Sequence, residues 1–187
     1  MKQNRENPFF ETYRTPFGTP PFDQIETEQY EPVFDEGIRQ LDEEVRAIAD
    51  NTELPTFENT IIALERSGKL LDKVISAFFN VLNAEADDEM MDISQRVSPK
   101  LSESSNNIYL NEQLFARVKS VYDRKDELHL PMEDARLLEK TFEAFCARGA
   151  ALGPEEKEKY RKLSSELSLL SLTFDQNALK DKNRYEL

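Results

Sequence analysis

The sequence predicts an all-α fold: a multi-helix, antiparallel bundle-like domain of about seven helices, preceded by an extended arm rich in proline and aromatic residues. Hydrophobic residues make up 39% of the 187 residues, with 12 Phe and 6 Tyr, which is enough apolar material for a packed core. Only five glycines are present, while the strong helix formers Leu, Glu, Lys and Ala abound. Apolar residues recur at spacings of three and four, and no long alternating pattern competes.

The arm is predicted over residues 1–26, and the helical domain over residues 27–187. Prolines exclude a helix near the start of the chain, at Pro8, Pro16, Pro20 and Pro21. The same stretch holds five aromatic residues, too many for a free tail, so we expect the arm to lie on a surface and bury rings there. Some rings should remain uncovered, and the candidates are Phe9, Phe10 and Phe17.

The first half of the domain is expected to form three helices. The first runs from about Thr27, its expected N-cap, to Asp50, with apolar residues in one stripe. The second runs from a cap at Thr56 to about Arg66, and Gly68 ends it. The third, from about residue 69 to 84, is apolar on more than one face, so it should be central and bury at least one of its two adjacent rings, Phe78 and Phe79.

Four more helices are expected in the second half. Asp87 or Asp88 caps one that reaches about residue 108 and should be kinked at Pro99. Asn111 caps the next, which should end near Leu128, and another spans residues 132–149. The last opens at Pro154 and ends around residues 182–183, and its apolar residues also recur at three and four: Tyr160, Leu163, Leu167, Leu170 and Phe174.

The charge is strongly negative and unevenly placed. The net charge is −13, and residues 23–65 alone carry −11. This argues against nucleic acid and anionic membranes as partners. Two interpretations of the acidic region remain open: a solvated helix face, or a surface that attracts cationic peptides. No apolar run approaches the ~18 residues of a membrane-spanning helix, and the first ten residues lack the apolar segment of a signal peptide.

The residue counts exclude most catalytic chemistry within this chain. One cysteine, Cys146, and one histidine, His129, cannot supply a zinc site, and an H-E-x-x-H motif needs two histidines. Cys146 lies in an apolar stretch and is expected to be a buried, inert thiol, while His129 is expected in a solvated loop. Adjacent acids such as Glu155 and Glu156 are explained as caps and solvated faces. We therefore predict no catalytic, cofactor-binding or metal-ligating residue in this chain.

Four segments nevertheless resemble a known family, and they occur in that family's order: P-F-D-Q-I at 21–25, Y-x-P-x-F-D-E-G at 30–37, N-T-I-I-A-L-E-x-S-G at 59–68 and N-I-Y-L-N-E-Q-L-F-A-R-V at 107–118. The chain is similar to the thimet-oligopeptidase-like zinc metallopeptidases, and within them to the bacterial peptidyl-dipeptidases. The resemblance implies the N-terminal part of a longer, mostly helical and cytoplasmic enzyme.

The same resemblance implies a role without catalysis. In such enzymes the N-terminal helices form one wall of a channel that admits short peptides, and the enzyme releases dipeptides from their C-termini. Zinc and its ligands would belong to a C-terminal catalytic half, and that half and short peptides are the implied partners. The alternative is a stand-alone acidic helical protein-interaction module.

Overall fold

The computed structural model describes residues 7–85 and 87–184, and in these ranges the chain is helical with no strand. The helices are α1 (Tyr30–Ala49), α2 (Ala63–Glu65), α3 (Lys69–Glu85), α4 (Asp88–Tyr109), α5 (Glu112–Tyr122), α6 (Met132–Ala147) and α7 (Pro154–Arg184). A π-helical turn, Phe57–Ile62, leads directly into α2. The predicted all-α class and its seven helical segments are confirmed.

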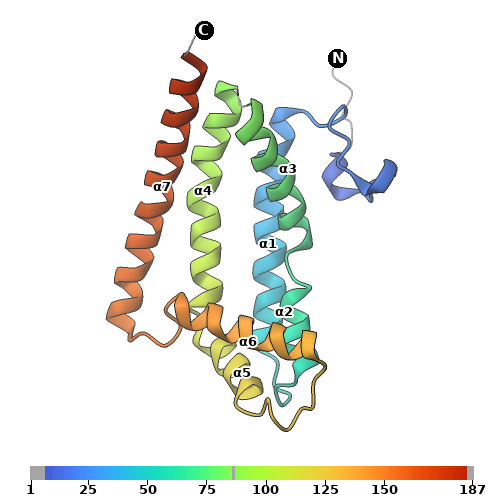
Figure 1. Ribbon diagram of the computed structural model, residues 1–187, viewed down its shortest axis with the longest axis vertical. Coiled ribbons are helices and arrows are strands. Elements are labelled where there is room, and N and C mark those ends of the chain that lie inside the picture. Colours follow the sequence, from blue (N-terminus) through green and yellow to red (C-terminus); the bar gives the residue numbers. More distant parts are fainter. Residues whose placement is uncertain (1–6, 86, 185–187) are drawn as a thin grey trace.

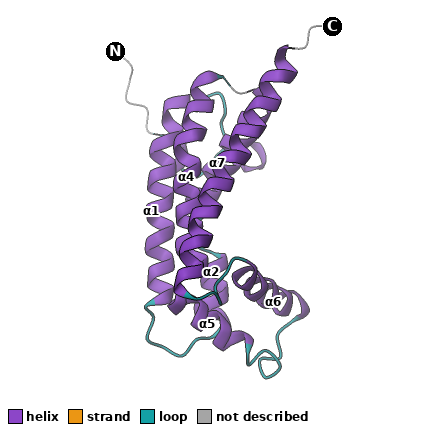
Figure 2. Ribbon diagram, turned by 90° about the vertical axis from the view of Figure 1, so that its left-hand side faces the viewer, coloured by secondary structure: helices purple, strands orange, loops and turns teal. Residues whose placement is uncertain are grey.

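The helices α1, α3, α4 and α7 stand side by side, and α5 and α6 cross their foot (Figure 1). α1 packs against α3 and α4, and α7 packs along the other side of α4. α5 and α6 pack together across the foot, and α6 projects to one side of it (Figure 2).

Local caps account for several helix starts as predicted. The Thr56 hydroxyl accepts a hydrogen bond from the backbone N–H of Asn59, and the Asn59 side chain accepts one from Thr56 N–H, at 3.1 and 2.8 Å. Asp87 and Asn111 cap α4 and α5 by accepting from the N–H groups three residues ahead. Gly68 takes φ +75°, a conformation that favours glycine, and separates α2 from α3.

Two predicted boundaries need correction. Thr27 is not an N-cap: it begins a 3-10 turn, Thr27–Gln29, and α1 starts at Tyr30. This places Pro32 in the first turn of α1, where its missing N–H costs no helical hydrogen bond. The helix after Asn111 ends at Tyr122 and not near Leu128, and turns follow it. α4 contains Pro99 and runs to Tyr109, close to its predicted end, and the kink expected at Pro99 stays a prediction.

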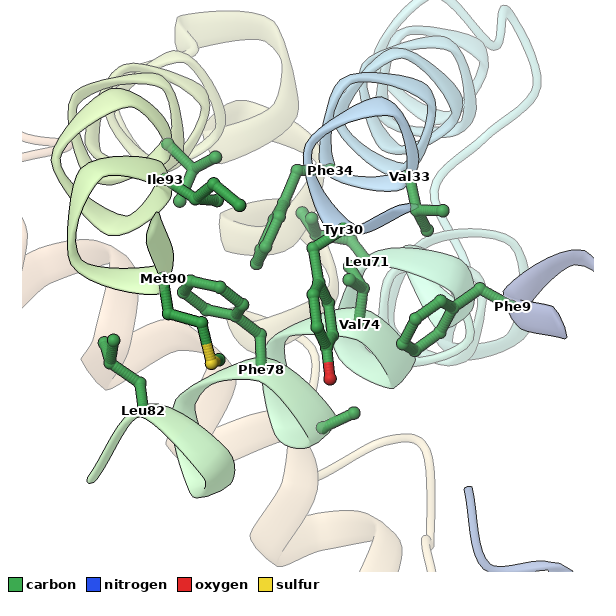
Figure 3. Close-up of a cluster of buried hydrophobic side chains, with 12 residues drawn as sticks. Phe9, Tyr30, Val33, Phe34, Leu71, Val74, Phe78, Leu82, Met90 and Ile93 are labelled. Carbon is green, nitrogen blue, oxygen red and sulfur yellow. The ribbon is translucent and has the colours of Figure 1, made fainter. Parts of the chain in front are cut away.

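The upper core lies between α1, α3 and α4. Figure 3 shows its side chains converging, with Phe78 of α3 at the centre and Phe9 entering from the arm. Phe78 is fully buried and meets the rings of Tyr30 and Phe34 at centroid distances of 5.0 and 5.3 Å. The expectation that α3 is central and buries a ring is therefore confirmed.

The lower core lies at the foot, where α5, α6 and the α2 segment meet the end of α1. Its fully buried members include Ile61, Leu114, Val118, Leu138 and Phe145. Among the described residues, α7 contributes no side chain to either core.

Candidate functional site

α7 carries an apolar stripe on the molecular surface, which we call the α7 outer face: Leu163, Leu167, Leu170 and Phe174. These side chains are 60–72% exposed. They recur at three and four, so they line one side of the helix over about 16 Å, at ~1.5 Å per residue. The predicted periodicity is confirmed, and the stripe points away from both cores.

The side of α7 that meets α4 is polar. Near its upper end, Gln176 is buried, accepts a hydrogen bond from Gln95 at 3.0 Å and donates to the Ser94 hydroxyl at 3.1 Å. Near its lower end, Asn106 of α4 donates to the Ser164 hydroxyl at 2.8 Å. α7 is thus attached to the bundle by neutral hydrogen bonds, each contributing about 1 kcal/mol.

The first turns of α7 add one ion pair to this attachment. The Lys157 Nζ lies 2.9 Å from the Glu112 carboxylate at the start of α5. The Lys157 side chain is largely buried, whereas Glu112 is mostly exposed. Because solvent screens the carboxylate, the pair adds little to the attachment.

A cleft of about 480 Å³ separates α4 and α7 between these two attachments. Serine hydroxyls from both helices line much of it: Ser98, Ser102, Ser105, Ser164, Ser168 and Ser171. Such small side chains provide little apolar packing between the helices. The α4–α7 contact is therefore more polar than the contact between α1 and α3.

The arm is attached to the N-terminal half of α3, and one prediction about it is wrong. Phe9 is not exposed: it is buried in the upper core, 5.4 Å from the Tyr30 ring. Lys73 of α3 holds the arm by donating to the Phe9 and Glu11 carbonyls at 2.7 and 2.5 Å. Phe17 is fully exposed, as expected, at φ 60°.

Tyr13 is the titratable group of the arm whose pKa is shifted furthest from its ordinary value. Burial, with a smaller contribution from nearby Tyr30, raises the pKa of Tyr13 to about 12. The Lys73 ammonium lies 3.7 Å from the centre of the Tyr13 ring. The arm is therefore held by one apolar ring and one cation over another ring.

Arg117 connects two of the family-like segments, and the sequence analysis does not single it out. It is 7% exposed, donates to the Asn51 and Glu53 carbonyls at 2.5 and 3.0 Å, and donates to the Asn59 side chain at 3.1 Å. The signal in the sequence is a charge directly beside Val118, on the inward side of an amphipathic helix. Arg117 thus fixes the loop before the Asn59 cap, which is a structural role.

Other family-like residues also have packing roles. Gly37 of α1 faces α3 so closely that a Cβ atom there would lie 3.0 Å from the Leu71 Cα. The Gly68 N–H donates to the Glu44 carboxylate at 2.7 Å, which joins the α2–α3 break to α1. These segments therefore hold the helices in register, and their residue types follow from that packing.

The residue types that bind metals do not gather in the described part of the chain. No group of three or more His, Cys, Asp or Glu side chains converges within the ranges described. His129 lies exposed in the turn after α5, as expected. Cys146 is exposed and not buried as predicted, because Phe145 takes the inward position on α6 and Cys146 follows it around the helix.

The acids of the N-terminal third mostly face solvent. Glu43 and Glu44 of α1 are exposed, while Asp42 accepts a hydrogen bond from the buried Ser104 at 3.3 Å. No helix in the described part of the chain is long and apolar enough to cross a membrane. The described part of the chain is thus a helical scaffold that leaves the α7 outer face exposed.

Comparison with known proteins gives that scaffold a family. The sequence is 42% identical to dipeptidyl carboxypeptidase of Escherichia coli over 173 residues, 92% of this chain and 25% of the relative. It is 39% identical over the same length to the Salmonella typhimurium enzyme of that name. A thimet-like oligopeptidase of Dictyostelium discoideum is 26% identical over 85% of the chain. No family model matches.

The chain is homologous to the N-terminal quarter of dipeptidyl carboxypeptidase and to the related oligopeptidases. The resemblance predicted from the four segments is confirmed. The chain spans about a quarter of the length of the curated relatives that it matches.

Proposed function

We propose that this chain is the N-terminal helical region of a zinc-dependent peptidyl-dipeptidase, and that its helices form one wall of the substrate channel. The whole enzyme would hydrolyse short peptides, release dipeptides from their C-termini and work in the cytoplasm. In this proposal the present chain supplies no catalytic residue and no zinc ligand. Both would come from the other three quarters of a protein the size of its relatives.

The single observation that carries this proposal is the extent of the match to dipeptidyl carboxypeptidase. Identity of 42% extends over 173 residues, 92% of the chain, which is far more than any single helix or motif. A match over one short motif would support only a shared local structure. A match over the whole scaffold supports a shared place in a larger enzyme.

The chemistry of the chain agrees with a role in shape and binding. Its one histidine is exposed in a turn, and the described carboxylates cap helices, pair with bases or face solvent. In this proposal the chain supplies walls and surfaces to the enzyme. A stand-alone interaction module is the second candidate, and the exposed α7 outer face favours it as well.

A chimera separates the two candidates. The N-terminal quarter of E. coli dipeptidyl carboxypeptidase is replaced by this chain, and dipeptide release from a short peptide is compared with that of the E. coli enzyme lacking its N-terminal quarter. We expect the chimera to release dipeptides and the shortened enzyme to release none. A soluble, folded chimera with no more activity than the shortened enzyme would contradict the proposal.

The isolated chain provides a second check. After dialysis it should hold no stoichiometric zinc, and it should not cleave peptides. One tightly bound zinc ion per chain, or turnover above the blank, would show that this region has a site of its own.

A further inference from the structure

The stretch of α7 that carries the outer face, residues 163–174, contains far fewer charged residues than the chain as a whole. One third of all residues are charged, yet the twelve residues from Leu163 to Phe174 include a single charged side chain, Glu166. Five leucines and one phenylalanine occupy the same stretch. This composition is typical of a helix covered on its apolar side.

The contacts that α7 makes within this chain cannot account for its length. Among its described side chains only Lys157 and Gln176 are buried, and both are polar. A helix gains most of its stability in a protein from burying an apolar face. The side of α7 toward α4 carries serines, Gln176 and the half-buried Tyr160 and Leu172, so the stripe of Leu163, Leu167, Leu170 and Phe174 is available for a second contact.

Resting on the proposed function, we infer that the α7 outer face is the surface on which the remaining part of the peptidase polypeptide packs. The occupant would present an apolar helical face to Leu163, Leu167, Leu170 and Phe174. The relatives are about four times as long as this chain, so they contain ample polypeptide for this contact. A covalently connected segment also has a high effective concentration, which a second copy of the chain lacks.

The charge distribution supports this surface over the acidic one. The acidic region, residues 23–65, carries −11, whereas residues 154–187 contain equal numbers of acids and bases. An apolar partner that covers α7 would therefore not bury an excess of acidic side chains. The interface would place α7 between two bodies: α4 on its polar side and the remainder of the enzyme on its apolar side.

The test uses the double variant Leu167→Ser, Leu170→Ser in the chimera described above, with Leu54→Ser as the matched control. Leu54 is 81% exposed in the loop after α1, away from α7. We expect the double variant to lose at least tenfold in kcat/KM and to become sensitive to protease, while the control keeps both properties. In the isolated chain, the double variant should keep the denaturant midpoint of the parent chain.

The other outcomes are distinguishable. If the parent chimera is active and the double variant keeps its activity and protease resistance, the inferred surface is wrong but the proposed function stands. If the parent chimera itself is inactive, the proposed function fails and this inference fails with it. If the isolated chain dimerises in sedimentation and the double variant abolishes the dimer, the occupant is a second copy, which overturns the inference.

Discussion

α3 and α7 have similar apolar periodicity and opposite environments. α3 buries Leu71, Val74 and Phe78 in the upper core (Figure 3), whereas α7 exposes Leu167 and Leu170 to solvent. The difference arises from the other side of each helix: α3 is apolar on more than one face, and α7 meets α4 with serine, asparagine and glutamine contacts. Periodicity therefore shows which residues share a face, but not which body covers that face.

The substitution Phe78→Ala tests whether α3 is central to the upper core, and it should have the largest effect. Removing a fully buried ring leaves a cavity in the upper core, so we expect a loss of about 3–5 kcal/mol in the free energy of unfolding. Phe79→Ala is the control, because Phe79 is only partly buried at the edge of the same core and should cost less. Chemical denaturation measures both. Losses under about 1 kcal/mol at both positions would mean that α3 is peripheral.

The substitution Gln176→Ala tests how α7 is attached to α4. Loss of this buried amide removes hydrogen bonds to Gln95 and Ser94, so we expect the attachment of α7 to weaken by about 2 kcal/mol. Hydrogen exchange of the α7 amides should then accelerate roughly thirtyfold, while the global denaturant midpoint stays unchanged. Gln113→Ala, at an exposed position on α5, is the matched control. A lower global midpoint for Gln176→Ala would show that α7 belongs to the cooperative core.

Many features of these helices follow from the sequence, and the confirmed predictions concern local structure. The seven helical segments follow from apolar spacing, and the caps at Thr56, Asp87 and Asn111 follow from hydrogen bonds that span three residues. Such features depend on neighbours in the chain. The absence of a catalytic constellation in this chain was predicted from residue counts in the same way, and it stays a prediction.

The wrong or missing predictions concern tertiary contacts. Phe9 was expected among the exposed rings, but the arm folds back and places it between α1 and α3. Cys146 was expected inside, but only one of two adjacent apolar positions on α6 can point into the core. The contact between Arg117 and the Asn59 cap joins positions far apart in the sequence, so spacing could not reveal it.

The arm offers the mildest test, because its attachment depends on pH. The pKa of Tyr13 is raised from its ordinary value of 10 to about 12, so the folded chain favours the neutral phenol. The resulting stabilisation is fully present below pH 10 and is lost as the pH rises toward 12. Burial also raises the pKa of Tyr30, so both tyrosines should contribute to a late step in the absorbance of tyrosinate during an alkaline titration. Tyr13→Phe should lower the amplitude of that late step by one tyrosine, and a loss of amplitude from the ordinary step near 10 would mean that the arm does not bury Tyr13.

The central claim is that α3 is stabilised within this chain while α7 lacks a partner on its apolar side. Amide hydrogen exchange of the isolated 187-residue chain, resolved by segment, tests it most directly. We expect the amides of α3 to exchange only through global unfolding, and those of α7 to exchange through local opening at least tenfold faster. Equal protection of α3 and α7 at concentrations where sedimentation shows a monomer would contradict the account.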